Sequence, residues 1–402
     1  METVATPKTA SAMDVAILTG GADRPYAFGL ATALLAGGSR LDLIAGDELE
    51  GPQFRDGSSV RFLNFRGDTR PDVGTVDKIW RVVRYYARLI RYAATAQPRI
   101  FHILWNNKFE TVDRTLLTAY YRLLGKRIVL TVHNVNAGKR DGTDSWFNRL
   151  TLRIQYRLAD HIFVHTEKMK SELAEDFGIR DAVTVIPFGI NNSVPVTNLS
   201  PDEAKRRLGL EPDEPTILFF GNIVPYKGLE YLLEAFQMLV LGNRRYRLVI
   251  AGRPRGPHAY WERIQDTLAH HIDPARVIQN ITFVSDEDTE LYFKAADVLV
   301  LPYTEIFQSG VLFLGYSFGL PVIAADVGSM KEDIVEGETG FVFVKKDSAD
   351  LARVIERYFA SELYAGLSER RRGIQERANE RHSWDTVSRM TRLVYQNLLR
   401  NS

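Results

Sequence analysis

Residues 216–228 read Thr-Ile-Leu-Phe-Phe-Gly-Asn-Ile-Val-Pro-Tyr-Lys-Gly, a strand, a loop and the start of a helix, as in an α/β fold. Its apolar start, 216–220, predicts a buried strand, and the apolar periodicity of 229–239 predicts the helix that follows. Gly221 lets the backbone approach a ligand at the strand end. Lys227 adds a cation to the positive end of the helix, a setting that suits a diphosphate, although a solvated lysine at a helix end is the plain alternative.

The same strand-then-helix unit recurs along the chain, which is typical of parallel α/β sheets. In the first half, strands are predicted at 14–18, 41–45, 60–65, 100–105, 127–133, 161–165 and 183–187. In the second half, they are predicted at 216–220, 247–251, 281–284, 298–302, 322–325 and 341–344. The sequence therefore predicts two Rossmann-like, doubly wound domains that face each other across a cleft, with ligands bound beyond the carboxyl ends of the strands.

The length of 402 residues fits two such domains. A polar, proline-punctuated stretch at 191–201 marks the join. We expect a disordered leader at 1–13, an amino-terminal domain at 14–195 and a carboxyl-terminal domain at 200–380. Residues 381–402 form one more amphipathic helix, too late in the chain for the second sheet, which we expect to return to the first domain.

Composition excludes several classes of protein. Apolar residues make up 45% of the chain and charged residues 25%, and the net charge is +1, which argues against disorder and against a nucleic-acid partner. There is no cysteine, hence no disulfide and no thiolate chemistry. No apolar stretch is long enough to span a bilayer, and we expect a cytoplasmic protein.

One helical stretch could hold the protein to a membrane. Residues Asp77 to Gln97 place arginines at spacings of three and four beside aromatic and aliphatic residues. This pattern suits a helix lying on the anionic inner face of a membrane. A solvated basic face with an aromatic core side explains it equally well.

A second ligand-binding motif is predicted at 302–310, before an almost wholly apolar helix at 311–318. Backbone amides at Gln308-Ser309-Gly310 are placed to cradle a phosphate, and Glu305 could accept hydrogen bonds from sugar or ribose hydroxyls. The alternative makes Ser309 a helix cap and Glu305 a surface residue.

Three further motifs follow strands. His133 and Asn134 stand at a strand end, where a histidine faces the cleft. Gly20 and Gly21 follow the first strand, where they permit either close approach of a substrate or a tight turn. Asp286-Glu287-Asp288 has the spacing of a metal-binding motif, but Ser285 before it favours a capped helix with acids in its first turn, and we expect no metal.

Taken together, these residues resemble the GT-B glycosyltransferases of family 4, retaining enzymes that use nucleotide sugars without a metal. The resemblance covers nearly the whole chain. It implies that Lys227 holds the donor diphosphate, that His133 touches the transferred sugar, and that Glu305 orients it. The remaining donor contacts implied are Gly221, Asn222, Gly252, Ser285, Gln308, Ser309, Gly310 and Val311, and those on the acceptor side are Gly20, Gly21 and Asn134.

The departures from the family pattern are specific. Asn222 stands where the family has an arginine that pairs with the lysine on the diphosphate. Ile306 and Leu314 stand where it has two glutamates, as in a branch with a Gln-Ser-Gly-Val turn. We expect transfer from a UDP- or GDP-sugar to a hydroxyl of a glycoconjugate or lipid-linked saccharide, without a cofactor. The alternatives are a nucleotide-sugar epimerase or hydrolase on the same fold, and a non-catalytic nucleotide-sugar-binding partner subunit.

Overall fold

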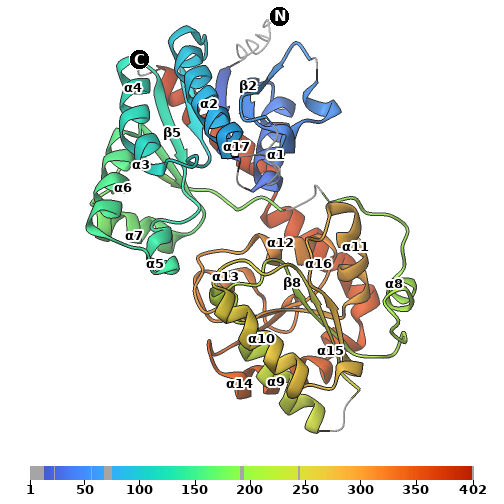
Figure 1. Cartoon of the computed structure of the whole chain (residues 1–402). Helices are drawn as coiled ribbons and strands as arrows, with labels where there is room; N and C mark the ends of the chain where they lie inside the picture. Colours follow the sequence, from blue (N-terminus) through green and yellow to red (C-terminus); the bar gives the residue numbers. More distant parts are fainter. Residues whose placement is uncertain are drawn as a thin grey trace, which may run out of the picture.

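The protein, seen here in a computed structural model, is described over residues 13–21, 23–55, 57–67, 75–190, 194–242 and 245–400. It has two α/β domains, the amino-terminal one above the carboxyl-terminal one in Figure 1. Each domain is built on a parallel sheet, one of seven strands and one of six. The prediction of two doubly wound, Rossmann-like domains is confirmed.

The amino-terminal sheet has the order β3-β2-β1-β4-β5-β6-β7. Its strands are β1 Asp14–Leu18, β2 Arg40–Ala45, β3 Val60–Asn64, β4 Ile100–Ile103, β5 Arg127–Thr131, β6 His161–Val164 and β7 Val183–Val185. Its helices are α1 Arg24–Ala36, α2 Thr75–Thr95, α3 Glu110–Val112, the π-helical turn η3 Asp113–Leu117, α4 Thr118–Leu123, α5 Ala137–Asp141, α6 Trp146–Leu158 and α7 Glu167–Phe177, with 3₁₀ turns η1 Asp47–Leu49 and η2 Pro52–Phe54.

The carboxyl-terminal sheet has the order β10-β9-β8-β11-β12-β13. Its strands are β8 Thr216–Phe220, β9 Arg247–Ala251, β10 Val277–Asn280, β11 Val298–Leu301, β12 Val322–Ala325 and β13 Gly340–Phe343. Its helices are α8 Pro201–Arg207, α9 Leu229–Leu241, α10 His258–His270, α11 Asp286–Ala295, α12 Gly310–Ser317, α13 Met330–Asp333, α14 Ser348–Phe359, α15 Glu362–Ala365 and α16 Leu367–Arg381, with 3₁₀ turns η4 Pro225–Lys227 and η5 Pro274–Arg276.

The strand order places the ligand-binding edge of each domain. The central strands β8, β11 and β12 carry almost only buried apolar side chains, because helices cover both faces of the sheet. In each sheet the winding reverses between two neighbouring strands, β1 and β4 in the first and β8 and β11 in the second. Crevices beyond the carboxyl ends of such strand pairs are where doubly wound domains bind ligands.

One predicted strand was misplaced. The structure has β10 at Val277–Asn280, paired with β9, and not at the apolar run Ile281–Val284. The strand β10 is the edge of its sheet and only half-buried, so it tolerates the polar residues Gln279 and Asn280. The apolar run after it leads into the cap of α11 instead.

The chain returns to the amino-terminal domain at its end. Helix α17, Trp384–Arg400, packs against α1, and the Ser388 hydroxyl donates to the Ala33 carbonyl at 2.9 Å. The Trp384 indole nitrogen donates to the Ile190 carbonyl at 2.8 Å, beside the place where the chain first leaves that domain. The expected leader up to residue 12, and Asn191–Ser193 of the expected linker, lie outside the described residues.

The stretch expected to contact a membrane is helical. It forms α2, Thr75–Thr95, at the front of the amino-terminal domain in Figure 1. In the described part of the chain, no helix is long and apolar enough to cross a bilayer.

Candidate active site

A cavity of about 300 Å³ lies between the two domains, beyond the carboxyl ends of β8 and β11. The carboxyl-terminal domain contributes most of its wall. Its lining residues from that domain include Lys227, Tyr303, Gln308, Ser309, Gly310 and Val311. From the amino-terminal domain, Asp23 and Tyr26 at the start of α1 close the cavity, together with Phe188. The structure therefore brings Lys227 and the Gln308-Ser309-Gly310 turn together.

Lys227 is a buried cation at this cavity. It ends the 3₁₀ turn η4, and Gly228 follows it at φ +63°. Only glycine fits there, because a side chain would lie 2.1 Å from the Pro302 carbonyl oxygen. The side chain of Lys227 is 6% exposed, and its Nζ lies 5.3 Å from the centre of the Tyr303 ring. Burial lowers the pKa of Lys227 to about 8. No carboxylate of the described residues forms an ion pair with it, so this cation lacks an anion.

The turn at 308–310 supplies donors without charge. Ser309 occupies the N-cap position of α12 and is buried, but its hydroxyl does not cap that helix. The amide of Gln308 donates to the Asp333 carboxylate at 3.2 Å, and its Oε1 is buried without a hydrogen-bond partner. The first amides of an apolar, buried helix thus meet the cavity together with an unpartnered amide oxygen.

Several residues predicted for the donor site lie elsewhere. Glu305 and Asn222 are exposed, and neither lines this cavity. Ser285 uses its hydroxyl to cap α11, accepting from the Asp288 backbone amide at 3.1 Å. Gly252 has a packing role, because a side chain there would lie 1.9 Å from the Gly221 carbonyl oxygen. Gly221 itself adopts φ +102° beside the Lys227 ammonium.

The acidic motif after Ser285 forms the first turn of α11. The helix-cap interpretation is confirmed, and Asp286 pairs with Arg24 of α1 across the domain boundary. In the described ranges no group of three or more histidine, aspartate or glutamate side chains is placed to hold a metal ion.

His133 is held by a stack of aromatic rings at the end of β5. Its ring stacks on Trp105 with centroids 4.0 Å apart, and it meets Tyr26 edge-on at 4.7 Å. The ring nitrogen Nδ1 lies 3.1 Å from Nε2 of His165. Burial and the neighbouring His165 hold the pKa of His133 well below its usual range, so the ring is neutral at pH 7.

The protonation of this histidine pair follows from its partners. Nδ1 of His165 lies 3.3 Å from the Ile186 carbonyl oxygen, which can only accept, so that nitrogen carries the proton. Nε2 of His165 is then an acceptor, and Nδ1 of His133 donates to it. This leaves Nε2 of His133 as a lone-pair acceptor, and it is buried without a partner. It can accept a hydrogen bond from a ligand hydroxyl.

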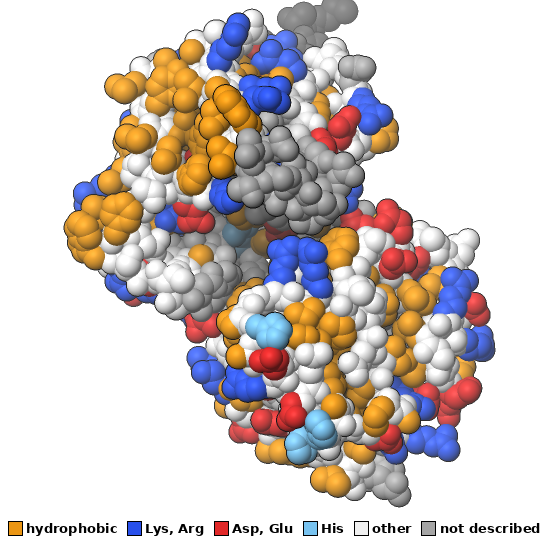
Figure 2. Space-filling view, viewed as in Figure 1, with side chains coloured by type: hydrophobic (Ala, Val, Ile, Leu, Met, Phe, Trp, Pro, Cys, Tyr) orange, Lys and Arg blue, Asp and Glu red, His pale blue; other side chains and the backbone are white. Residues whose placement is uncertain are grey.

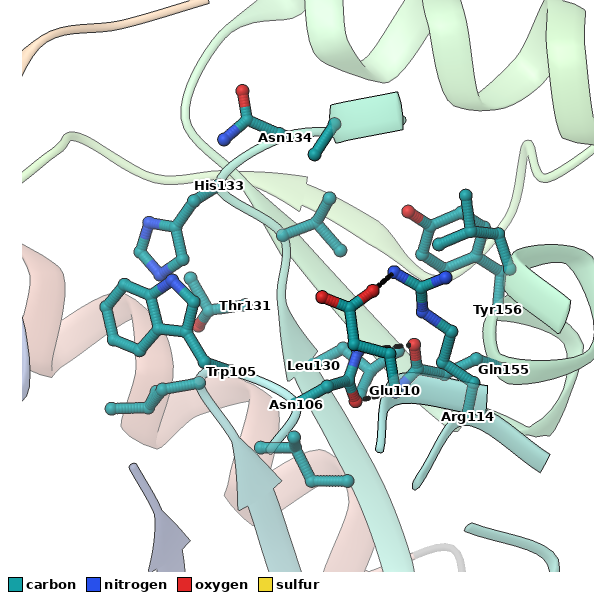
Figure 3. Close-up of a pocket in the computed structure, with 15 residues that line it drawn as sticks. Trp105, Asn106, Glu110, Arg114, Leu130, Thr131, His133, Asn134, Gln155 and Tyr156 are labelled. Atoms are coloured by element: carbon teal, nitrogen blue, oxygen red, sulfur yellow. Dashed lines mark hydrogen bonds and ion pairs between the residues drawn. The ribbon is translucent and has the colours of Figure 1, made fainter. Parts of the chain in front are cut away.

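A smaller cavity of about 160 Å³ opens beside His133 in the amino-terminal domain. Figure 3 shows His133 and Trp105 on one side of it and an Arg114–Glu110 ion pair on the other. Between them the amides of Asn106 and Gln155 exchange two hydrogen bonds, of 3.2 and 2.7 Å.

Asn134 lines this cavity, as its place at the strand end predicts. Trp105, Arg114 and Gln155 were missed by sequence reasoning, because their role depends on pairs made between distant segments. Gly20 packs against the backbone of Trp105, since a side chain there would lie 2.4 Å from the Trp105 carbonyl oxygen.

Comparison with known families accounts for both domains. Residues 19–194 match the family described as Glycosyltransferase Family 4, and residues 200–381 match Glycosyl transferases group 1. The chain therefore consists of two glycosyltransferase domains. It belongs to the GT-B glycosyltransferases, with a family 4 domain followed by a group 1 domain.

Relatives and solved structures agree with this assignment. A D-inositol 3-phosphate glycosyltransferase of Streptomyces bingchenggensis is 30% identical over 252 residues, 60% of this chain and 54% of that protein. The match thus spans about half the length of that relative. An uncharacterised glycosyltransferase of Methanocaldococcus jannaschii is 24% identical over 384 residues, 92% of each chain.

Two solved structures share the fold over almost the whole length. Sucrose-phosphate synthase from Thermosynechococcus elongatus superposes with a TM-score of 0.77 at 19% identity, covering 97% of this chain and 100% of that chain. Anabaena HepE, solved in complex with UDP-glucose, superposes with a TM-score of 0.70 at 15% identity, covering 96% and 99%.

Proposed function

We propose that the protein transfers a sugar from a UDP- or GDP-sugar to a hydroxyl of a glycoconjugate or lipid-linked saccharide, with retention of anomeric configuration and without a metal ion. The observation that carries the proposal is the buried Lys227 ammonium, which faces the cavity between the domains without a carboxylate partner among the described residues. The leaving group of such a donor is a nucleoside diphosphate, an anion that matches this cation.

In this proposal the carboxyl-terminal domain binds the diphosphate, and the amino-terminal domain binds the transferred sugar. As the bond between the anomeric carbon and the phosphate oxygen breaks, negative charge grows on the departing diphosphate, and Lys227 and the amides at the start of α12 stabilise it. The low dielectric of the buried site strengthens this interaction. His133, on the other side of Tyr26, accepts a hydrogen bond from a hydroxyl of the transferred sugar through its free Nε2. Both groups act by positioning and electrostatics.

The polar cavity beside His133 suits the acceptor. Its amide pair and ion pair offer donors and acceptors to sugar hydroxyls, and it lies at the carboxyl ends of β4 and β5. Complexes of Anabaena HepE with UDP and UDP-glucose show that a neighbour with this fold binds such donors. This supports the nucleotide-sugar assignment.

Labelled UDP- and GDP-sugars, incubated with the purified protein and a membrane extract, test the proposal. We expect labelled product from one donor, with the anomeric proton signal of the retained configuration. Lys227→Ala should lower the rate by about 10²- to 10³-fold, the usual loss for one group that stabilises the developing charge. Lys168→Ala, at an exposed lysine of α7, is the matched control. Release of free or epimerised sugar without transfer would contradict the proposal.

We also propose that the acceptor is met at an anionic membrane surface, through α2. On a helix of 3.6 residues per turn, Ile79, Val83 and Ile90 fall on one exposed face with Trp80 at its border. A row of exposed arginines follows on the next face, Arg84, Arg88 and Arg91, and the third face packs on the core. An apolar stripe beside a cationic row fits the boundary between acyl chains and lipid headgroups.

The apolar surface extends beyond α2. Phe109 stacks on Tyr86 of α2 at 6.1 Å, and it is exposed together with Val112 and Leu116. Figure 2 shows hydrophobic side chains gathered over this part of the amino-terminal domain.

Binding to vesicles tests the membrane contact. We expect the protein to sediment with phosphatidylglycerol vesicles and not with phosphatidylcholine vesicles. A Trp80→Ser, Val83→Ser double variant should lose this binding. Leu241→Ser, at an 87% exposed leucine of the other domain, should keep it. Equal sedimentation of wild type and double variant would refute the contact.

A further inference from the structure

A second, cationic cavity of about 100 Å³ lies in the amino-terminal domain, apart from the two described above. Three segments form it: the end of β3, the loop after β4 and the second turn of α2. Each segment contributes one cation, Arg66, Lys108 and Arg81 respectively, and Tyr85, Tyr86 and Asn107 complete the wall.

Arg66 stands out among these cations. Its Nη1 is buried and has no hydrogen-bond partner. The guanidinium occupies the space beside Gly21, where a side chain at φ +72° would place a carbon 1.2 Å from that nitrogen. An unpaired, desolvated donor on a charged group destabilises a fold, because its lost hydration is not replaced. A bound anion would replace it.

Two carboxylates lie near the cavity, those of Asp113 and Glu48. Asp113 accepts from the Tyr86 hydroxyl at 2.9 Å and from the Asn107 backbone amide. The Oε1 of Glu48 accepts from the Gly46 backbone amide at 3.2 Å, and its Oε2 is buried without a hydrogen-bond partner. No carboxylate of the described residues forms an ion pair with Arg66 or Lys108. Three cations line the cavity against these two carboxylates, so it keeps a net positive charge.

The cavity belongs to the acceptor side of the cleft. Gly21, against which Arg66 lies, follows Gly20, and Gly20 lies against Trp105. Trp105 stacks on His133, which in turn meets Tyr26 at the wall of the donor cavity. A continuous row of contacts thus leads from Arg66 to the place where the sugar is transferred, without passing through the donor-phosphate residues.

We propose that this cavity binds a phosphate group of the acceptor, so that the acceptor is a phosphorylated compound whose free hydroxyl reaches the sugar near His133. Arg66 and Lys108 carry the charge recognition. A planar guanidinium matches two phosphate oxygens, and an exposed ammonium adds a second charge. The inference rests on the proposed transfer function, and it deepens that function by naming the acceptor class.

Two sources of such a phosphate share this chemistry. One is a water-soluble sugar or polyol phosphate, and the other is a lipid whose phosphate or diphosphate bears the sugar. Helix α2 supplies Arg81 to the cavity and also carries the exposed apolar face. A lipid held on that face could therefore place its phosphate in the cavity. The acceptors chosen for the assay separate the two sources.

Binding of inorganic phosphate tests the cavity without the acceptor. It is measured as a rise in melting temperature, with UDP present to fill the donor cavity. We expect the rise in wild type, its loss in Arg66→Gln and its weakening in Lys108→Gln. Arg55→Gln removes an exposed arginine paired with Glu50 in the same domain, and should keep the rise. No rise in wild type, or the same rise in Arg66→Gln, would overturn the proposal.

Transfer assays then compare phosphorylated acceptors with their unphosphorylated forms. We expect kcat/KM to be at least tenfold higher with the phosphate, either on sugar phosphates or on a polyprenyl-phosphate sugar in vesicles. Arg66→Gln should remove this preference and leave the KM for donor unchanged. Equal use of both forms by wild type would refute the inference. Failure of transfer with every donor, while phosphate binding depends on Arg66, would count against the proposed function and leave the anion site supported.

Discussion

Replacing Lys227 by methionine should stabilise the empty protein while it abolishes donor binding. Burial lowers the pKa of Lys227 from 10.5 to about 8, and each pH unit corresponds to about 1.4 kcal/mol. The charged lysine therefore destabilises the folded state by about 3 kcal/mol at pH 7. Methionine has a similar shape and no charge, so it removes this cost. The Lys227→Met substitution keeps the shape of the side chain and removes its charge, so its effects on stability and on donor binding should have opposite signs.

The stability of the wild type should change with pH in a direction set by the pKa of Lys227. The folded-state pKa lies below the unfolded value of 10.5, so between pH 8 and 10.5 the unfolded chain holds the extra proton. Stability of the wild type should therefore rise with pH across that window, and the destabilisation is complete below pH 8. In Lys227→Met this rise is absent. The difference between the two proteins should shrink from about 3 kcal/mol at pH 7 towards zero near pH 10.5.

Urea denaturation followed by circular dichroism at pH 7 and pH 9.5 measures this difference, and titration with UDP measures donor binding. Lys168→Met, at an exposed lysine, should change neither. A Lys227→Met protein that is less stable than wild type at pH 7 would show that the ammonium is compensated in the empty protein. A difference that does not change with pH would refute the assignment of its cause to the buried charge.

Three further outcomes are expected. His133→Phe keeps the stack on Trp105 but loses the ring acceptor, so kcat/KM should fall by about 10- to 100-fold, as for loss of a hydrogen bond to a buried group. Gly252→Ala should destabilise the fold by at least about 3 kcal/mol in urea denaturation, because its side chain meets the Gly221 carbonyl, whereas Gly373→Ala in α16 has open space and should be neutral or stabilising. Chelation with EDTA should leave the initial rate of transfer unchanged, and a loss restored by Mg²⁺ or Mn²⁺ would contradict the metal-free proposal.

Most of the fold could be read from the sequence because both sheets are parallel. Buried strands such as β8 and β12 are short apolar runs between amphipathic helices, and this pattern depends only on local composition. The edge strand β10 was misplaced for the opposite reason. This strand is only partly buried, so its pairing with β9 sets its position more than its own hydrophobicity does.

The sequence predicts those residues of the cavity between the domains whose meeting follows from the order of the strands. Lys227 and the Gln308-Ser309-Gly310 turn follow strands that are neighbours at the reversal of winding, so their meeting follows from topology. Whether a loop side chain points into the cavity does not follow from topology. Glu305 stands three residues before Gln308 in the same loop and is nevertheless exposed.

The acceptor side depends on contacts that no local pattern encodes. Tyr26 shows why. Its ring meets His133 of β5 at 4.7 Å, Phe188 of the segment that leaves the domain at 5.3 Å, and Trp384 of the returning helix at 5.2 Å. Phe188 in turn stacks on Phe313 of α12 at 5.3 Å. His133 and α12 are thus linked through the two segments that cross between the domains. A change in the angle between the domains would therefore shift the rings that contact Tyr26, and these rings come from distant parts of the sequence that no local pattern connects.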